Sequence, residues 1–70
     1  MTATVVRHKI EEAFKRSADV DARRVSVEAH NGTVVLKGTV HSLTERAAAE
    51  HAAWATPGVI VIDDQLIVEP

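Results

Sequence analysis

The chain has 70 residues, of which 46% are hydrophobic and 3% aromatic, and its eight Lys and Arg against ten Asp and Glu give a formal net charge of −2. A chain of this length forms one small domain that buries only about 60% of its unfolded surface, so we expect modest stability. The negative charge disfavours nucleic-acid binding, which depends mainly on neutralising phosphates. Without cysteine, disulfides and thiolate metal sites are excluded.

No apolar run approaches the roughly 18 residues of a membrane-spanning helix, and the first residues lack the charged and apolar regions of a signal peptide. If the chain is complete, we therefore expect a cytoplasmic protein. If it is a module of a longer precursor, an export signal could lie upstream.

Apolar residues recur at helical spacing from Thr4 to about Ser17 and predict an amphipathic first helix. The apolar positions are Val6, Ile10, Ala13 and Phe14. In the connection 19–22, we interpret the two aspartates as turn or cap residues rather than metal ligands.

Asn31-Gly32 between two alternating apolar runs predicts a β-hairpin, because both residues tolerate the positive φ of a type I′ turn. The turn fixes the register of strands over 25–30 and 33–40, and one face of this pair is apolar. Gly38 falls on that apolar face, where glycine indicates a bulge or the close approach of another backbone, and we expect a helix to cross there.

Ser42-Leu43-Thr44-Glu45 is a capping box, in which Ser42 accepts from the Glu45 backbone N–H and the Glu45 side chain reaches back to Ser42. The second helix that it opens is predicted to run to Ala55 and to end at Thr56-Pro57-Gly58. One face of this helix carries small residues for close packing on the sheet: Ala49, Ala52, Ala53 and Thr56.

Alternation from Ile60 to Val68 predicts a third strand. Its core face is expected to carry Ile62, Leu66 and Val68, and its outer face Val61, Asp63, Gln65 and Ile67. The predicted fold is α+β, a two-layer αββαβ sandwich with two helices on one face of a three-stranded sheet. The strands that flank the second helix should be parallel, whereas the order of the three strands stays open.

In order and spacing, the chain from Val6 to Val68 resembles a BON domain. The matching positions are Asn31-Gly32, Val34, Leu36, Gly38, Val40, Ala49, Ala52, Gly58-Val59, Ile62, Leu66 and Val68. Asp64 departs from the pattern, since the family often has asparagine there. We assign structural roles to six residues: Asn31, Gly32, Gly38, Ser42, Glu45 and Gly58.

The resemblance implies an αββαβ module, often in tandem, of bacterial proteins of the envelope and of osmotic or other stress. It implies binding to phospholipid or to other macromolecules, a periplasmic or envelope location, and no enzymatic activity. The family has no agreed set of ligand-contacting residues that carries over to this chain.

The residues also disfavour catalysis, which needs a nucleophile beside a base or two carboxylates with separated pKa values. The three serines lie outside any such arrangement, and Asp63 and Asp64 of one strand point to opposite faces. The histidines, at positions 8, 30, 41 and 51, lack the paired spacing of metal ligands, so we expect neither metal nor cofactor. RNA binding in the manner of a KH domain is disfavoured by the lack of a G-x-x-G loop and of a strand aromatic.

Trp54, the single tryptophan, lies off the core face of the second helix. Such a residue suits a membrane interface or a protein interface, unless its ring folds back and completes the core. The candidate contact residues on this side are Trp54, His51, Arg46 and Ala47. Five basic residues would favour anionic lipid if they converged, namely Arg7, Arg23, Arg24, Lys37 and Arg46.

The outer face of the sheet is the second candidate surface, formed by Val35, Lys37, Val61 and Ile67. If the strands align the three apolar side chains into a patch, this face docks a protein partner or a sister domain. Two functions therefore stay open for the 1–70 domain, whose core spans about 6–68. One is a non-enzymatic module that associates with phospholipid surfaces through Trp54, and the other is a protein-interaction module.

Overall fold

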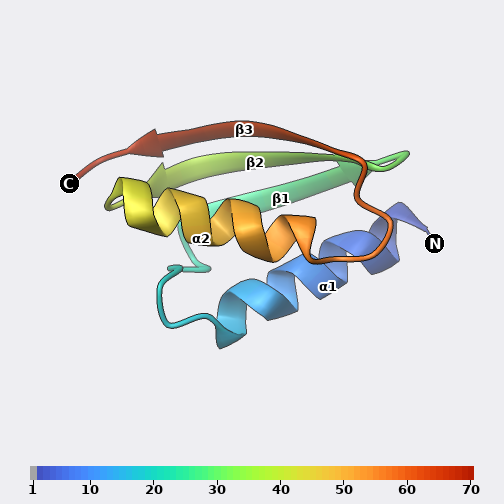
Figure 1. Ribbon diagram of the computed structural model, residues 1–70, viewed down its shortest axis with the longest axis horizontal. Helices are drawn as coiled ribbons and strands as arrows, with labels where there is room; N and C mark the ends of the chain where they lie inside the picture. The colour runs from blue at the N-terminus through green and yellow to red at the C-terminus, as the bar shows by residue number, and fades with distance from the viewer. Residues whose placement is uncertain (1) are drawn as a thin grey trace.

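The computed structural model describes residues 2–70 as two helices and three strands. The elements follow the order α1 (Ala3–Arg16), β1 (Val25–His30), β2 (Thr33–Val40), α2 (Leu43–Trp54) and β3 (Val61–Val68). The sheet order is β1-β2-β3, with β1 antiparallel and β3 parallel to β2 (Figure 1). The predicted α+β fold with both helices on one sheet face is confirmed, and the strand order, which stayed open above, is sequential.

The β1–β2 hairpin has the predicted turn and register. Asn31 and Gly32 adopt φ values of 49° and 83°, as a type I′ turn requires. His30 lies opposite Thr33, and the register continues to Val25 opposite Gly38. The apolar face of both strands therefore points to the helices.

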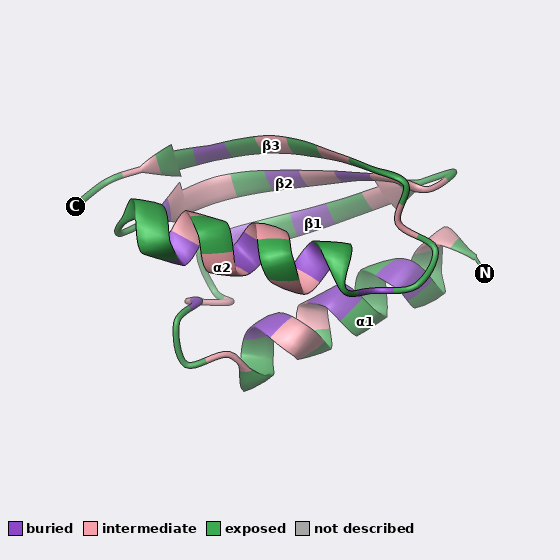
Figure 2. Ribbon diagram, viewed as in Figure 1, coloured by how far each residue is buried: buried purple, intermediate pink, exposed green. Residues whose placement is uncertain are grey.

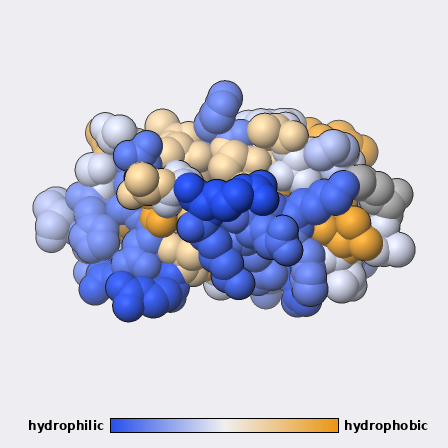
Figure 3. All heavy atoms as spheres, turned by 90° about the horizontal axis from the view of Figure 1, so that it is seen from below, coloured by the Kyte–Doolittle hydropathy of each residue, from blue (hydrophilic) through white to orange (hydrophobic). Residues whose placement is uncertain are grey.

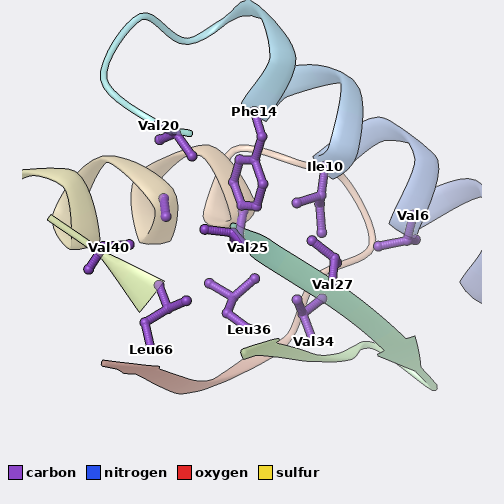
Figure 4. Packing of buried hydrophobic residues seen from close by; sticks show 12 residues of the cluster. Val6, Ile10, Phe14, Val20, Val25, Val27, Val34, Leu36, Val40 and Leu66 are labelled. Carbon is purple, nitrogen blue, oxygen red and sulfur yellow. The ribbon is translucent and has the colours of Figure 1, made fainter. Parts of the chain in front are cut away.

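The core fills the space between this face and the helices. Figure 4 shows Val6, Ile10 and Phe14 of α1 directed toward the side chains of the sheet, and Figure 2 shows buried residues on the facing sides of the two layers. The small face of α2 is confirmed, since Ala49 and Ala53 are fully buried. Small side chains let this helix approach the sheet closely.

A close backbone contact requires glycine at position 38, but the contact is not with a helix as predicted. Its φ is 122°, and a Cβ atom would collide with the carbonyl oxygen of Arg24. The same carbonyl accepts a hydrogen bond from the Thr39 N–H at 3.1 Å. The segment that crosses closely at Gly38 is therefore the entry to β1 rather than a helix.

Only one of the two hydrogen bonds predicted for the capping box of α2 is present. Ser42 Oγ accepts from the Glu45 N–H at 3.1 Å, but the Glu45 side chain does not return to Ser42. Its Oε1 accepts from the His41 N–H at 2.8 Å, and its Oε2 accepts from the Asp21 N–H at 3.0 Å. The carboxylate is drawn inward because α2 packs beside the α1–β1 connection, where the Asp21 N–H needs an acceptor.

Strand β3 alternates as predicted, and the register places Asp64 on the side of the helices, opposite Leu36. Asp63 and Gln65 lie on the outer face, which no helix covers. Asp21, in the connection after α1, accepts from the Arg23 N–H at 3.1 Å, which confirms the predicted turn role.

Candidate functional site

Trp54 lies on the outer side of α2, with 53% of its surface exposed. His51 and Ala47 are exposed on the same helix. The Trp54 ring therefore does not fold back to complete the core. A half-exposed indole at the end of a helix is available to an apolar partner.

Arg46, the fourth of these candidate contact residues, is engaged with carboxylates of its own chain. Its Nε lies 2.9 Å from Asp64 Oδ2 and 3.7 Å from Glu50 Oε2. The hydrogen bond with Asp64 raises the pKa of Arg46. Because the guanidinium is already paired with carboxylates of its own chain, it is a weak candidate for binding lipid phosphate.

The Asp64 carboxylate is the centre of this group. Burial raises its pKa, but contacts with Glu50, Arg46 and the Leu66 amide hold that pKa below the usual value. The pKa of Glu50 is raised, first by its contact with Asp64 and then by burial. Only 11% of the Asp64 side chain is exposed, so this charge lies beneath α2 and not on the outer sheet face.

The outer sheet face does not gather its apolar side chains. Val61 pairs with Thr33 and Ile67 with Thr39, at opposite ends of β3. Val35 lies opposite Asp63, diagonally from Val61, and polar residues separate it from Ile67. Lys37 lies opposite Gln65, with its Nζ 3.5 Å from Glu28 Oε2 on β1. The four candidate residues share one face but form no continuous patch.

A different arrangement appears at one end of the molecule. We define the hairpin end as residues 2–9, 29–34 and 54–62: the first half of α1, the β1–β2 turn, and the segment from the end of α2 into β3. Figure 1 shows these segments together at the end that holds the N-terminus. Of the six large apolar residues exposed among 2–70, this end carries four: Val5, Trp54, Ile60 and Val61.

Backbone contacts hold the hairpin end together. The Gly32 carbonyl accepts from the Ile60 N–H at 2.8 Å and from the Val61 N–H at 3.2 Å. A cavity of about 190 Å³ lies where the hairpin meets the start of α1 and the α2–β3 loop, with Thr2, Asn31 and Gly58 in its wall. Ile60 is held over Gly32 with 71% of its surface exposed.

The hairpin end also differs in charge. It contains Arg7 and Lys9 and no acidic residue, a formal charge of +2, whereas the rest of the chain carries a net −4. Glu11, one turn further along α1, has Oε1 3.9 Å from the Arg7 Nε and offsets part of this charge. Figure 3 shows hydrophobic residues at this end of the helix face and mainly hydrophilic residues over its middle and opposite end.

The described residues contain neither a membrane-spanning helix nor a metal-binding cluster. Within residues 2–70 no helix is long and apolar enough to cross a bilayer. The same part of the chain brings no three acidic or histidine side chains together in a way that holds a metal ion.

The BON domain family model matches residues 2–70, essentially the whole chain. The chain belongs to the BON family. No match was found among curated proteins. Membership of the BON family is consistent with a binding module, but it does not assign contact residues in this chain.

The hairpin end of this BON domain contains residues that sequence reasoning missed. Val5 and Lys9 lie one helical turn apart on α1, but Ile60 lies far from them along the chain, where the alternation predicts only the start of a strand. One signal was present in the sequence: three separate segments without a single acidic residue. Only the fold shows that these segments meet.

Proposed function

We propose that this BON domain is a non-enzymatic module that binds the surface of anionic phospholipid membranes through its hairpin end. The observation that carries the proposal is the exposure of four large apolar residues at the one end that has basic but no acidic residues. Apolar side chains gain from entry into the interfacial region, and a Trp ring is well suited to it.

Charge contributes the second part of the binding energy. Each Lys or Arg near an anionic leaflet is worth about 1 kcal/mol, so Arg7 and Lys9 offset the repulsion of a chain that is acidic overall. Arg46, paired with Asp64, has no part in the proposed contact. The proposal includes a role at the bacterial envelope under osmotic or other stress, with no cofactor.

The experiment compares two aliphatic residues of nearly equal exposure at opposite ends of the molecule. Ile60 is 71% and Leu43 is 70% exposed. We expect Ile60→Asp to weaken binding to vesicles of phosphatidylglycerol and phosphatidylcholine by about tenfold or more, since a charge replaces an inserted apolar group. Leu43→Asp should bind as the parent protein does. Co-sedimentation measures binding, and a blue shift of the Trp54 emission reports its contact with lipid.

Equal loss in both variants would show that the added negative charge, and not its position at the hairpin end, weakens binding. Unchanged binding of Ile60→Asp would exclude the hairpin end, and a parent protein that does not sediment with anionic vesicles would exclude the membrane function itself.

The open sheet face supports a second candidate function, docking of a protein partner or a sister domain. The observation in its favour is that Ile67 is exposed on a sheet face that neither helix covers. This function predicts that Ile67→Lys or Val35→Lys abolishes an association that is indifferent to lipid, whereas Trp54→Ala leaves it unchanged.

A further inference from the structure

Strand β3 is an edge of the sheet, and its outer side carries unpaired backbone groups. The Val61 N–H donates to the carbonyl of Gly32 in the β1–β2 turn, and the Glu69 N–H donates to the carbonyl of Val40 at the end of β2. Because alternate residues of a strand direct their N–H and C=O groups to opposite sides, the residues between them with even numbers direct theirs outward. These residues are Ile62, Asp64, Leu66 and Val68.

The composition of β3 favours pairing with another strand. Two apolar runs, Val61-Ile62 and Leu66-Ile67-Val68, flank the polar centre, and the strand contains neither Pro nor Lys. Long apolar edge strands are templates for intermolecular pairing, and natural proteins protect them with inward-pointing charges. Asp64 is such a charge, since its side chain points toward α2.

Asp64 also covers the middle of the edge directly. Its Oδ1 accepts from the outward-directed Leu66 N–H at 2.9 Å. Its Oδ2 accepts from Arg46 Nε at 2.9 Å, which fixes the carboxylate beneath α2. One side chain therefore occupies a pairing group of the edge and places a charge beside it.

We propose that Asp64 keeps the β3 edge from pairing with the β3 edge of a second copy of this chain. The strand is self-complementary: antiparallel pairing centred on Gln65 sets Ile62 against Val68 of the second copy. The same register sets Asp64 against Leu66 of the second copy. Pairing then takes the Leu66 N–H away from Asp64 and leaves a nearly buried carboxylate without that donor, beside an apolar side chain, which opposes association.

The test uses three substitutions on β3. Asp64→Val removes both the acceptor and the charge, and Asp64→Asn keeps an acceptor for the Leu66 N–H. Asp63→Val is the matched control, because it makes the same replacement on the outer face of the same strand. Mass is measured by sedimentation over a wide range of protein concentration, and amide hydrogen exchange locates the contact.

We expect Asp64→Val to double in apparent mass as concentration rises, with new protection of the Ile62 and Val68 amides. The parent protein, Asp64→Asn and Asp63→Val should stay monomeric. A monomeric Asp64→Val variant overturns the proposal, as does equal association of Asp63→Val, because apolarity alone then explains the effect. Association of Asp64→Val without protection of the β3 amides assigns the contact to another surface and overturns it too.

A measurement on the parent protein makes the test independent of whether the variants fold. The Leu66 amide should exchange more slowly than the outward amides of Ile62 and Val68, since only Leu66 has a partner on that side. Equal exchange of the three amides, or a parent protein that already pairs through β3, overturns the proposal. None of these outcomes depends on lipid, so failure here is distinct from failure of the proposed function.

Discussion

Glu45 is a buried charge that joins three parts of the chain. Its side chain is 6% exposed and accepts from the backbone N–H groups of Asp21 and His41, while its own N–H is capped by Ser42. These hydrogen bonds tie the α1–β1 connection and the end of β2 to the first turn of α2. A charged acceptor that satisfies two N–H groups stabilises the fold more than a single neutral hydrogen bond.

Replacing Glu45 by Ala should lower the free energy of unfolding by about 2–4 kcal/mol, because two backbone N–H groups lose their acceptor in a partly buried site. Urea denaturation followed by circular dichroism measures the change. Glu12→Ala is the control, since Glu12 is exposed on α1 and should cost under about 0.5 kcal/mol. A cost for Glu45→Ala as small as that of the control would show that the geometry does not stabilise the fold.

The same contacts make stability depend on pH. Hydrogen bonds from the His41 and Asp21 amides hold the pKa of Glu45 below its usual value of 4.5. The folded protein thus binds this proton less tightly than the unfolded chain does, so the stabilisation is complete above 4.5 and is lost as pH falls below it. The difference in unfolding free energy between the parent and Glu45→Gln should be largest at neutral pH and shrink in acid. A pH-independent difference contradicts this account.

Among the elements, the β1–β2 hairpin was fully predictable from sequence, because turn chemistry and alternation are local and agree on one register. The helices followed from spacing in the same way. The contacts of Glu45 and Gly38 were not predictable in detail, since their partners, Asp21 and Arg24, are set by how the α1–β1 connection packs. The capping-box pattern identified the right acceptor, Glu45, but the wrong donor, since its side chain accepts from the His41 and Asp21 N–H groups and not from that of Ser42.

In the candidate site, too, local features were predictable from sequence and contacts between distant elements were not. Helical spacing, which is local, placed Trp54 off the core face, but it left open whether the ring folds back, and the fold shows that it stays exposed. The pairing of Arg46 with Asp64, and the gathering at one end of the start of α1 and the segment between α2 and β3, depend on contacts between elements distant in sequence. Local periodicity contains no information on which of several exposed faces become neighbours.

The hairpin element supports a comparison of two glycines with positive φ. A Cβ at Gly38 meets the Arg24 backbone, whereas a Cβ at Gly32 meets the flexible end of the Ile60 side chain. We expect Gly38→Ala to destabilise the protein by about 3 kcal/mol or more and Gly32→Ala by less, since only the latter has a neighbour that can rotate away. Thermal unfolding of both variants gives the order, and the reverse order would contradict it.

At the scale of the whole molecule, the separation of charge matters more than the net value. A chain of net charge −2 is repelled by an anionic surface on average, yet its hairpin end presents +2 and the remainder −4. Such a distribution orients the molecule during approach, and the effect weakens with ionic strength. Binding through the hairpin end is therefore expected to decrease as salt is added.

Two double variants of α1 separate local charge from net charge. Arg7→Glu with Lys9→Glu reverses the charge at the hairpin end, and Lys15→Glu with Arg16→Glu makes the same change at the other end of the helix. Both lower the net charge equally. We expect the first pair to abolish binding to phosphatidylglycerol vesicles and the second to leave most of it. The second pair costs about 0.3–1 kcal/mol of stability per residue, because basic side chains favour a helix C-terminus. If co-sedimentation falls equally in both double variants, the protein responds to net charge alone and the hairpin end has no special role. A loss confined to the first pair assigns the electrostatic contact to Arg7 and Lys9.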